Sequence, residues 1–143
     1  MAVIVDTSAW IEFFKPRGST QVKSALAAAL QEGIVVTVAP ILVELLVGLN
    51  PARRTDARAI ERVRDLGVVS LDWNACEIAG TFGRALGARG RRVPTVDLMM
   101  AGAAAAAGHE IWHVGDQHFV WIKQIGGPSE RDLSAPSPGH RRP

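Results

Sequence analysis

The sequence has almost no cysteine, and this scarcity excludes two classes of protein. Cys76 is the only one in 143 residues, so neither an internal disulfide nor a metal cluster held by thiolates can form within the chain. A disulfide-free chain fits a reducing compartment. Because the neighbours of Cys76 favour a helix, we expect it to be a small buried thiol.

The chain also lacks long hydrophobic runs. No apolar stretch approaches the roughly 18 residues that cross a bilayer, and the first residues lack the basic leader and apolar segment of a signal peptide. With 48% hydrophobic residues and a mean hydropathy of +0.12, the composition is that of one compact globular domain. We therefore expect a cytoplasmic protein.

Positive charge is in only slight excess, and lysine is rare. The formal net charge of +2 is too small to indicate nucleic-acid binding by itself. Lys15, Lys23 and Lys123 are the only lysines among 16 cationic residues, so arginine supplies nearly all of them. An excess of arginine reflects a GC-rich genome or serves planar, bidentate contact with phosphate, and composition leaves both explanations open.

Apolar strands alternate with helical patterns along most of the chain. Strands are predicted at residues 2–5, 34–38, 68–71 and 111–114, with a fifth at 120–125. About seven helices are expected, the clearest at residues 8–14, 20–31, 40–49, 53–66, 74–88 and 95–107. This alternation predicts an α/β fold with a parallel sheet of four to five strands between helices. The domain is expected over 1–127, and residues 128–143 form a polar, proline-punctuated segment expected to be disordered.

Asp6 directly follows the first predicted strand, whose residues Val3, Ile4 and Val5 read as buried on both faces. Groups just past the carboxyl end of a strand face the crevice in which open α/β sheets bind ligands. Asp6 is therefore a candidate site residue. The alternative is that it only caps the helix that follows.

Three further acids have unusual neighbours. Glu44 lies in a helical stretch, 41–47, that is apolar all round, which predicts a buried carboxylate; a buried salt bridge to an arginine is the alternative. Asp97 lies in the first turn of a helix rich in small residues, where it could simply compensate the helix dipole. Asp116 follows the fourth strand, as Asp6 follows the first, or else is an ordinary turn residue.

Taken together, the four acids point to one edge of a parallel sheet. Carboxylates that share a pocket repel each other unless a cation lies among them. An all-oxygen site suits Mg²⁺ or Mn²⁺, which keep bound waters and accept phosphate oxygens. Such an ion activates water for phosphodiester hydrolysis. The pattern therefore favours a metal-dependent phosphodiesterase.

Several short motifs, in order, resemble the PIN-domain ribonucleases, and more narrowly the VapC toxins of bacterial type II toxin–antitoxin modules. The resemblance runs from Val3 to about Ile125. Its carriers are residues 5–11 (VDTSAWI), Pro40 with Glu44 and Gly48, 93–97 (VPTVD) before an alanine-rich helix, and 115–119 (GDQHF). No single motif is specific, but the ordered set is.

The resemblance implies a PIN-like three-layer sandwich and an endoribonuclease that cleaves RNA by metal-activated water. It implies metal ligands at Asp6, Glu44, Asp97 and Asp116, with Ser8 or Thr7 as a supporting hydroxyl. It also implies Mg²⁺ as cofactor (Mn²⁺ being an option), an RNA substrate, a homodimer and a cognate VapB-type antitoxin. The chain has Val114 where many members carry a hydroxyl residue, which leaves Ser8 to supply that group.

Two other functions share part of this pattern. An aspartyl-nucleophile phosphatase requires a second acid where this chain has Ser8, so that class is disfavoured. A catalytically inactive PIN-like module that binds RNA or a partner remains the alternative, although the presence of all four acids speaks against it.

Weaker candidates surround these acids. Four arginines before Asp97 could hold an RNA backbone or be a solvated helix end: Arg84, Arg89, Arg91 and Arg92. His118 could orient water, but packing beside Phe119 is the preferred interpretation. Trp10 and Trp112 are expected in the core, and Trp73 and Trp121 at an exposed or dimer surface.

Overall fold

The computed structural model describes residues 1–136 and contains a five-stranded, fully parallel sheet. The strands are β1 (Val3–Val5), β2 (Val35–Thr37), β3 (Gly67–Val68), β4 (Glu110–His113) and β5 (Glu130–Asp132), in the order β3-β2-β1-β4-β5. Seven helices occur in the described part of the chain: α1 (Thr7–Phe14), α2 (Thr20–Glu32), α3 (Ala39–Gly48), α4 (Arg54–Arg64), α5 (Trp73–Ala88), α6 (Thr95–Ala107) and α7 (Gln117–Gln124). The predicted α/β class and parallel sheet are confirmed.

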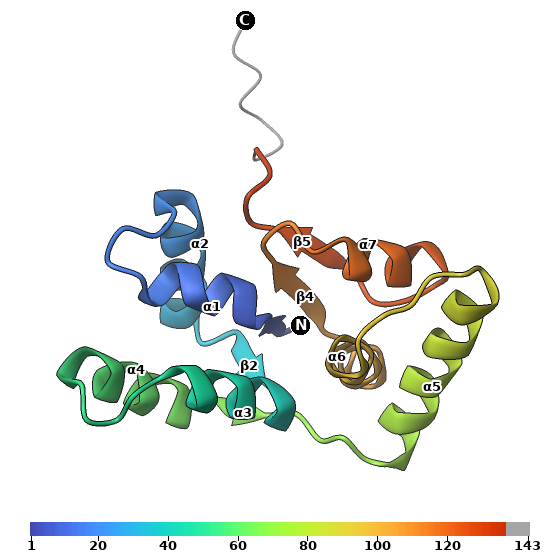
Figure 1. Cartoon of the computed structure of the whole chain (residues 1–143), viewed down its shortest axis with the longest axis horizontal. Coiled ribbons are helices and arrows are strands. Elements are labelled where there is room, and N and C mark those ends of the chain that lie inside the picture. The colour runs from blue at the N-terminus through green and yellow to red at the C-terminus, as the bar shows by residue number, and fades with distance from the viewer. Residues whose placement is uncertain (137–143) are drawn as a thin grey trace, which may run out of the picture.

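Helices cover both faces of the sheet. In Figure 1, α1 and α2 lie on one side, α6 and α7 lie on the other, and α5 packs outside α6. The α5–α6 contact is close, because a Cβ atom on Gly102 would lie 2.4 Å from the carbonyl oxygen of Ala75. This contact fixes α6, the helix that carries Asp97.

The central strand is the hydrophobic one predicted at the start of the chain. Val3, Ile4 and Val5 are all buried, with β2 on one side of β1 and β4 on the other. The chain first builds the sheet outward through β2 and β3, then returns to add β4 on the opposite edge of β1. The carboxyl ends of β1 and β4 therefore flank a topological switch point, where open parallel sheets have their ligand crevice.

The predicted fifth strand at residues 120–125 is wrong, because that segment belongs to α7. Phe119 and Ile122 are its buried residues, and their spacing of three matches a helix turn. The real fifth strand, β5, is the sequence Glu-Arg-Asp within the segment expected to be disordered. The tail therefore begins later than residue 128, and its last part, 137–143, lies outside the described residues.

β5 was missed because it has no apolar alternation. It is an edge strand, held by parallel pairing with β4 and by polar contacts of its own side chains. Leu133, which follows it, is fully buried and anchors the segment to the core.

Most single-residue expectations about burial hold. Trp10 and Trp112 are in the core, whereas Trp73 is 79% exposed. Cys76 is exposed, contrary to expectation, since Ala75 and Ala79 are the residues of that helix turn that face inward. None of the helices in residues 1–136 has the length and apolarity required to cross a membrane.

Candidate functional site

Asp6 terminates β1 and at the same time caps α1. Its Oδ2 accepts a hydrogen bond from the backbone N–H of Ser8 (3.2 Å) and from the Ser8 hydroxyl (2.6 Å). The residue is only 7% exposed. Burial raises the pKa of the Asp6 carboxyl, the Ser8 hydrogen bonds counteract this, and the charge of Asp116 adds to the increase. Asp6 therefore does cap α1, and it also lies near a second acid, Asp116.

The Ser8 side chain connects the ends of two strands. Its hydroxyl donates to Asp6 and accepts a hydrogen bond from the backbone N–H of Val114, just after β4, at 3.2 Å. Ser8 therefore fixes the Asp6 carboxylate against the end of β4.

Asp97 lies in the first turn of α6 and is buried, with 9% of its surface exposed. Its Oδ2 is 2.9 Å from Nδ1 of His118. Burial, together with the negative charges of Asp116 and Asp6, raises the pKa of Asp97 to about 6, and His118 offsets only part of the increase. The charges of both Asp116 and Asp6 act on Asp97, which indicates that the three aspartates lie near one another.

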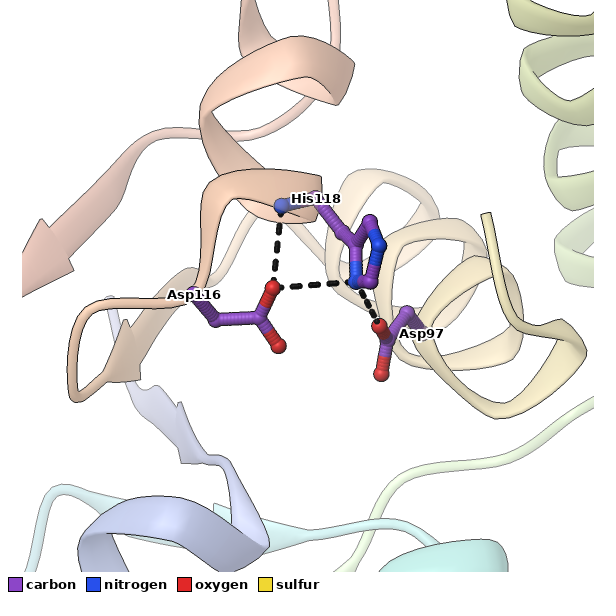
Figure 2. A group of neighbouring side chains, drawn as sticks. All are labelled: Asp97, Asp116 and His118. Carbon is purple, nitrogen blue, oxygen red and sulfur yellow. Dashed lines mark hydrogen bonds and ion pairs between the residues drawn. The ribbon is translucent and has the colours of Figure 1, made fainter. Parts of the chain in front are cut away.

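Asp116 caps α7 and faces Asp97 across the imidazole of His118. Its Oδ1 accepts a hydrogen bond from the backbone N–H of His118 (2.9 Å) and lies 3.1 Å from Nδ1 of the same residue (Figure 2). One ligand atom from each of Asp97, Asp116 and His118 lies within 4.8 Å of the others, a spacing that could hold a metal ion. Within residues 1–136, no lysine or arginine forms an ion pair with any of the three aspartates.

The expectation that His118 packs beside Phe119 is wrong. Its ring bridges the two carboxylates and lies edge-on to Trp121, with 5.5 Å between ring centroids. The sequence does contain a sign of this contact, because His118 lies two residues after Asp116. In the first turn of a capped helix, that residue lies beside the capping carboxylate.

Known proteins with similar sequences identify the family to which this chain belongs. The family model of the PIN domain matches residues 3–120, most of the chain. The chain belongs to the PIN domain family. Ribonuclease VapC18 of Mycobacterium tuberculosis is similar to it, with 29% identity over 133 residues, which cover 91% of this chain and 94% of VapC18.

Solved structures give the same fold. This PIN domain resembles VapBC-1 from nontypeable Haemophilus influenzae, with a TM-score of 0.73, 20% identity, and coverage of 94% of this chain and 100% of that one. It also resembles FitAcB from Neisseria gonorrhoeae, with a TM-score of 0.72, 16% identity, and coverage of 92% and 97%. The predicted resemblance to VapC-type PIN domains is therefore confirmed.

Glu44 differs from the other predicted ligands of this PIN domain. The stretch 41–47 is not buried all round, since Val43 and Val47 on α3 are 61% and 83% exposed, and Glu44 is exposed too. The expected burial of this carboxylate is wrong. Glu44 lines a hollow of about 370 Å³ together with Thr7, whose buried hydroxyl has no hydrogen-bond partner among residues 1–136. No hydrogen bond or ion pair within residues 1–136 joins Glu44 to the aspartates.

The four arginine candidates are at the end of α5 and in the connector to α6. Arg91 is the one linked to the acidic cluster, because its guanidinium stacks on Trp121 at 4.9 Å and Trp121 contacts His118. It also donates a hydrogen bond to Gln124. Arg84, Arg89 and Arg92 are exposed, and Arg84 is directed to Thr81 within its own helix.

Proposed function

We propose that this PIN domain is a metal-dependent endoribonuclease that hydrolyses RNA phosphodiester bonds, and that it is the toxin of a type II toxin–antitoxin module. One observation carries the proposal: Asp97, Asp116 and His118 offer ligand atoms within 4.8 Å of one another. The charge of Asp6 acts on the same group, and none of the three aspartates pairs with a lysine or arginine within residues 1–136. The similarity to a protein named as a ribonuclease supports the same reaction.

The donor set fits a hard divalent cation. Carboxylate oxygens are the ligands that Mg²⁺ and Mn²⁺ prefer, and the raised pKa values of Asp6 and Asp97 reflect repulsion and burial that a cation would relieve. We propose Asp6, Asp97 and Asp116 as ligands of Mg²⁺, with Mn²⁺ as an alternative that also accepts the imidazole nitrogen of His118. When bound, such an ion supplies a nucleophile at neutral pH and charge stabilisation for the phosphate.

The remaining residues position these groups or the substrate. Ser8 holds Asp6 through its hydroxyl, and we assign it a supporting role at the site. Glu44 and Thr7 line the neighbouring hollow, where we propose that Glu44 acts as an additional ligand when substrate and metal are bound. Arg91 and Arg92, which line one hollow, are the proposed contacts to the RNA backbone, and Arg84 and Arg89 on the preceding segment are further candidates.

We further propose a VapB-type antitoxin and a second copy of the chain as partners. The VapBC and FitAcB structures resembled by this chain support an antitoxin partner. Exposed apolar side chains on α3, such as Val43 and Val47, are typical of a protein contact surface. An RNA substrate and a free, exposed Cys76 fit the cytoplasm.

Induced expression in a bacterial host tests the proposal. Wild-type protein should arrest growth and produce new RNA 5′ ends at defined positions, which would also identify the target. Asp6→Asn and Asp97→Asn should abolish both effects, whereas Glu61→Gln, which removes an exposed carboxylate of α4, should retain them. Folding of each variant is checked by circular dichroism.

Full RNA cleavage by Asp97→Asn would contradict the assignment of the site. Growth arrest without new 5′ ends would instead favour a PIN-like module that binds RNA or a partner without cleaving it.

A further inference from the structure

The turn that presents Asp116 is held by two carboxylates of the edge strand β5. Residues 114–116 connect β4 to α7, and Gly115 within this turn adopts a positive φ of 63°. β5 pairs with β4 alongside the turn (Figure 1). Neither β5 carboxylate belongs to the acidic cluster described above.

Glu130 acts on Asp116 through His113. The His113 side chain is 1% exposed, its Nε2 lies 2.5 Å from a carboxylate oxygen of Glu130, and its Nδ1 accepts a hydrogen bond from the backbone N–H of Asp116 at 3.0 Å. An accepting Nδ1 carries no proton, so the ring proton is on Nε2 and is donated to Glu130. Glu130 thereby fixes the tautomer and the orientation of the ring that holds the Asp116 amide.

Asp132 acts on the preceding residue. Its Oδ1 accepts a hydrogen bond from the backbone N–H of Gly115 at 2.9 Å, and from both the N–H and the hydroxyl of Ser134. The Ser134 contacts hold the carboxylate in place. Two successive amides of the turn are therefore held by these side chains: Gly115 directly by Asp132 of β5, and Asp116 by His113 of β4, which Glu130 of β5 holds in turn.

We propose that Glu130 and Asp132 are positioning residues that set the direction of the Asp116 carboxylate. The inference rests on the proposed function for the role of Asp116 as a metal ligand, but the anchoring itself does not. Both residues lie beyond residue 120, where the match to the PIN domain family ends, so this chain completes its site with an element outside that match.

Four variants of the full chain test the proposal, in pairs. Glu130→Ala and Asp132→Ala remove the acceptors, whereas Glu130→Gln and Asp132→Asn keep a carbonyl oxygen that can accept the same hydrogen bond. Arg131→Ala is the matched control, because Arg131 lies on the same strand but stacks on Trp112 instead of contacting the turn.

Two readouts are measured. Amide hydrogen exchange at Gly115 should become faster in Asp132→Ala, and exchange at Asp116 faster in Glu130→Ala, with no change in Arg131→Ala. Calorimetric titration with Mn²⁺ alone should show affinity reduced about 10- to 100-fold in the alanine variants and largely restored in the amide variants.

Unchanged exchange at both amides, or an equal loss of Mn²⁺ affinity in Arg131→Ala, would overturn the proposal. If the alanine variants fail to fold, the amide variants decide the test. They must fold and keep their Mn²⁺ affinity within about threefold of the wild-type value. That limit is less than one kcal/mol of binding free energy, at about 1.4 kcal/mol per factor of ten. Wild-type protein that binds no Mn²⁺ would contradict the proposed function, and amide exchange would still test the anchoring.

Discussion

Without a divalent cation, the charge on Asp97 should destabilise the folded protein at neutral pH. Its pKa is raised to about 6 by burial and by the charges of Asp116 and Asp6, compared with about 3.9 in an unfolded chain. Below pH 4 the carboxyl is protonated in both states and carries no penalty. As pH rises through 6 the folded state must also ionise, so stability that is present at low pH is lost.

The size of this loss follows from the pKa difference. At about 1.36 kcal/mol per unit of pKa, the loss is at most about 3 kcal/mol. Because solvent screens part of the interaction, we expect a value between about 1 and 3 kcal/mol. Asp97→Asn removes the charge. We therefore expect the variant to be more stable than wild type by about 1–3 kcal/mol at pH 7.5 in EDTA, and to lose this advantage at pH 4.

Urea unfolding followed by tryptophan fluorescence measures both free energies, since buried Trp10 and Trp112 report on the core. Glu61→Gln, which removes an exposed carboxylate, should show no such pH-dependent gain. The electrostatic reasoning would be refuted if Asp97→Asn were equally or less stable than wild type at pH 7.5.

Two further predictions concern the neighbours of the cluster. Ser8→Ala should lower the free energy of unfolding by about 1–3 kcal/mol, because the Val114 N–H loses its acceptor and Asp6 loses a donor. Ser8→Thr should retain wild-type stability in the same urea assay. An unchanged free energy of unfolding in Ser8→Ala would argue that the Ser8 hydroxyl does not connect Asp6 to Val114. Replacing Arg91 and Arg92 by glutamate should reduce the slope of log K against log salt by about 1.4 for a fluorescent single-stranded RNA in EDTA. The same double change at Arg53 and Arg54, at the start of α4, is the control, and an identical slope in both double variants would exclude the proposed RNA contact.

The sequence predicted the parts of the fold that depend on hydrophobic pattern. β1 and β2 consist mainly of consecutive apolar residues, β4 has the apolar pair Ile111 and Trp112 at its centre, and most of these residues are buried as that pattern requires. β5 could not be found in this way, because Glu130, Arg131 and Asp132 have no apolar period and are held by polar contacts to residues distant in sequence. The segment of α7 was misread as a strand because Phe119–Ile122 is a short, continuous apolar run, which fits a buried strand as well as a helix.

The site residues divide in the same way into those that local pattern predicts and those that depend on tertiary contacts. Asp6, Asp97 and Asp116 could be proposed from the sequence because each lies at a predicted strand end or helix start, which local pattern reveals. The burial predicted for Glu44 failed because an apolar helix can expose a face, as α3 does at Val43 and Val47. The place of His118 beside Asp116 follows from the capped first turn of α7, but its contact with Asp97 depends on tertiary packing of α7 against α6, which no local pattern contains.

RNA cleavage by the purified protein, with the divalent cation removed and then restored, tests the central claim most directly. We predict that EDTA abolishes the cleavage seen in Mg²⁺ or Mn²⁺, that an excess of either ion restores it, and that Asp116→Asn is inactive under every condition. Cleavage that continues undiminished in excess EDTA would contradict the assignment of Asp6, Asp97 and Asp116 to a metal centre.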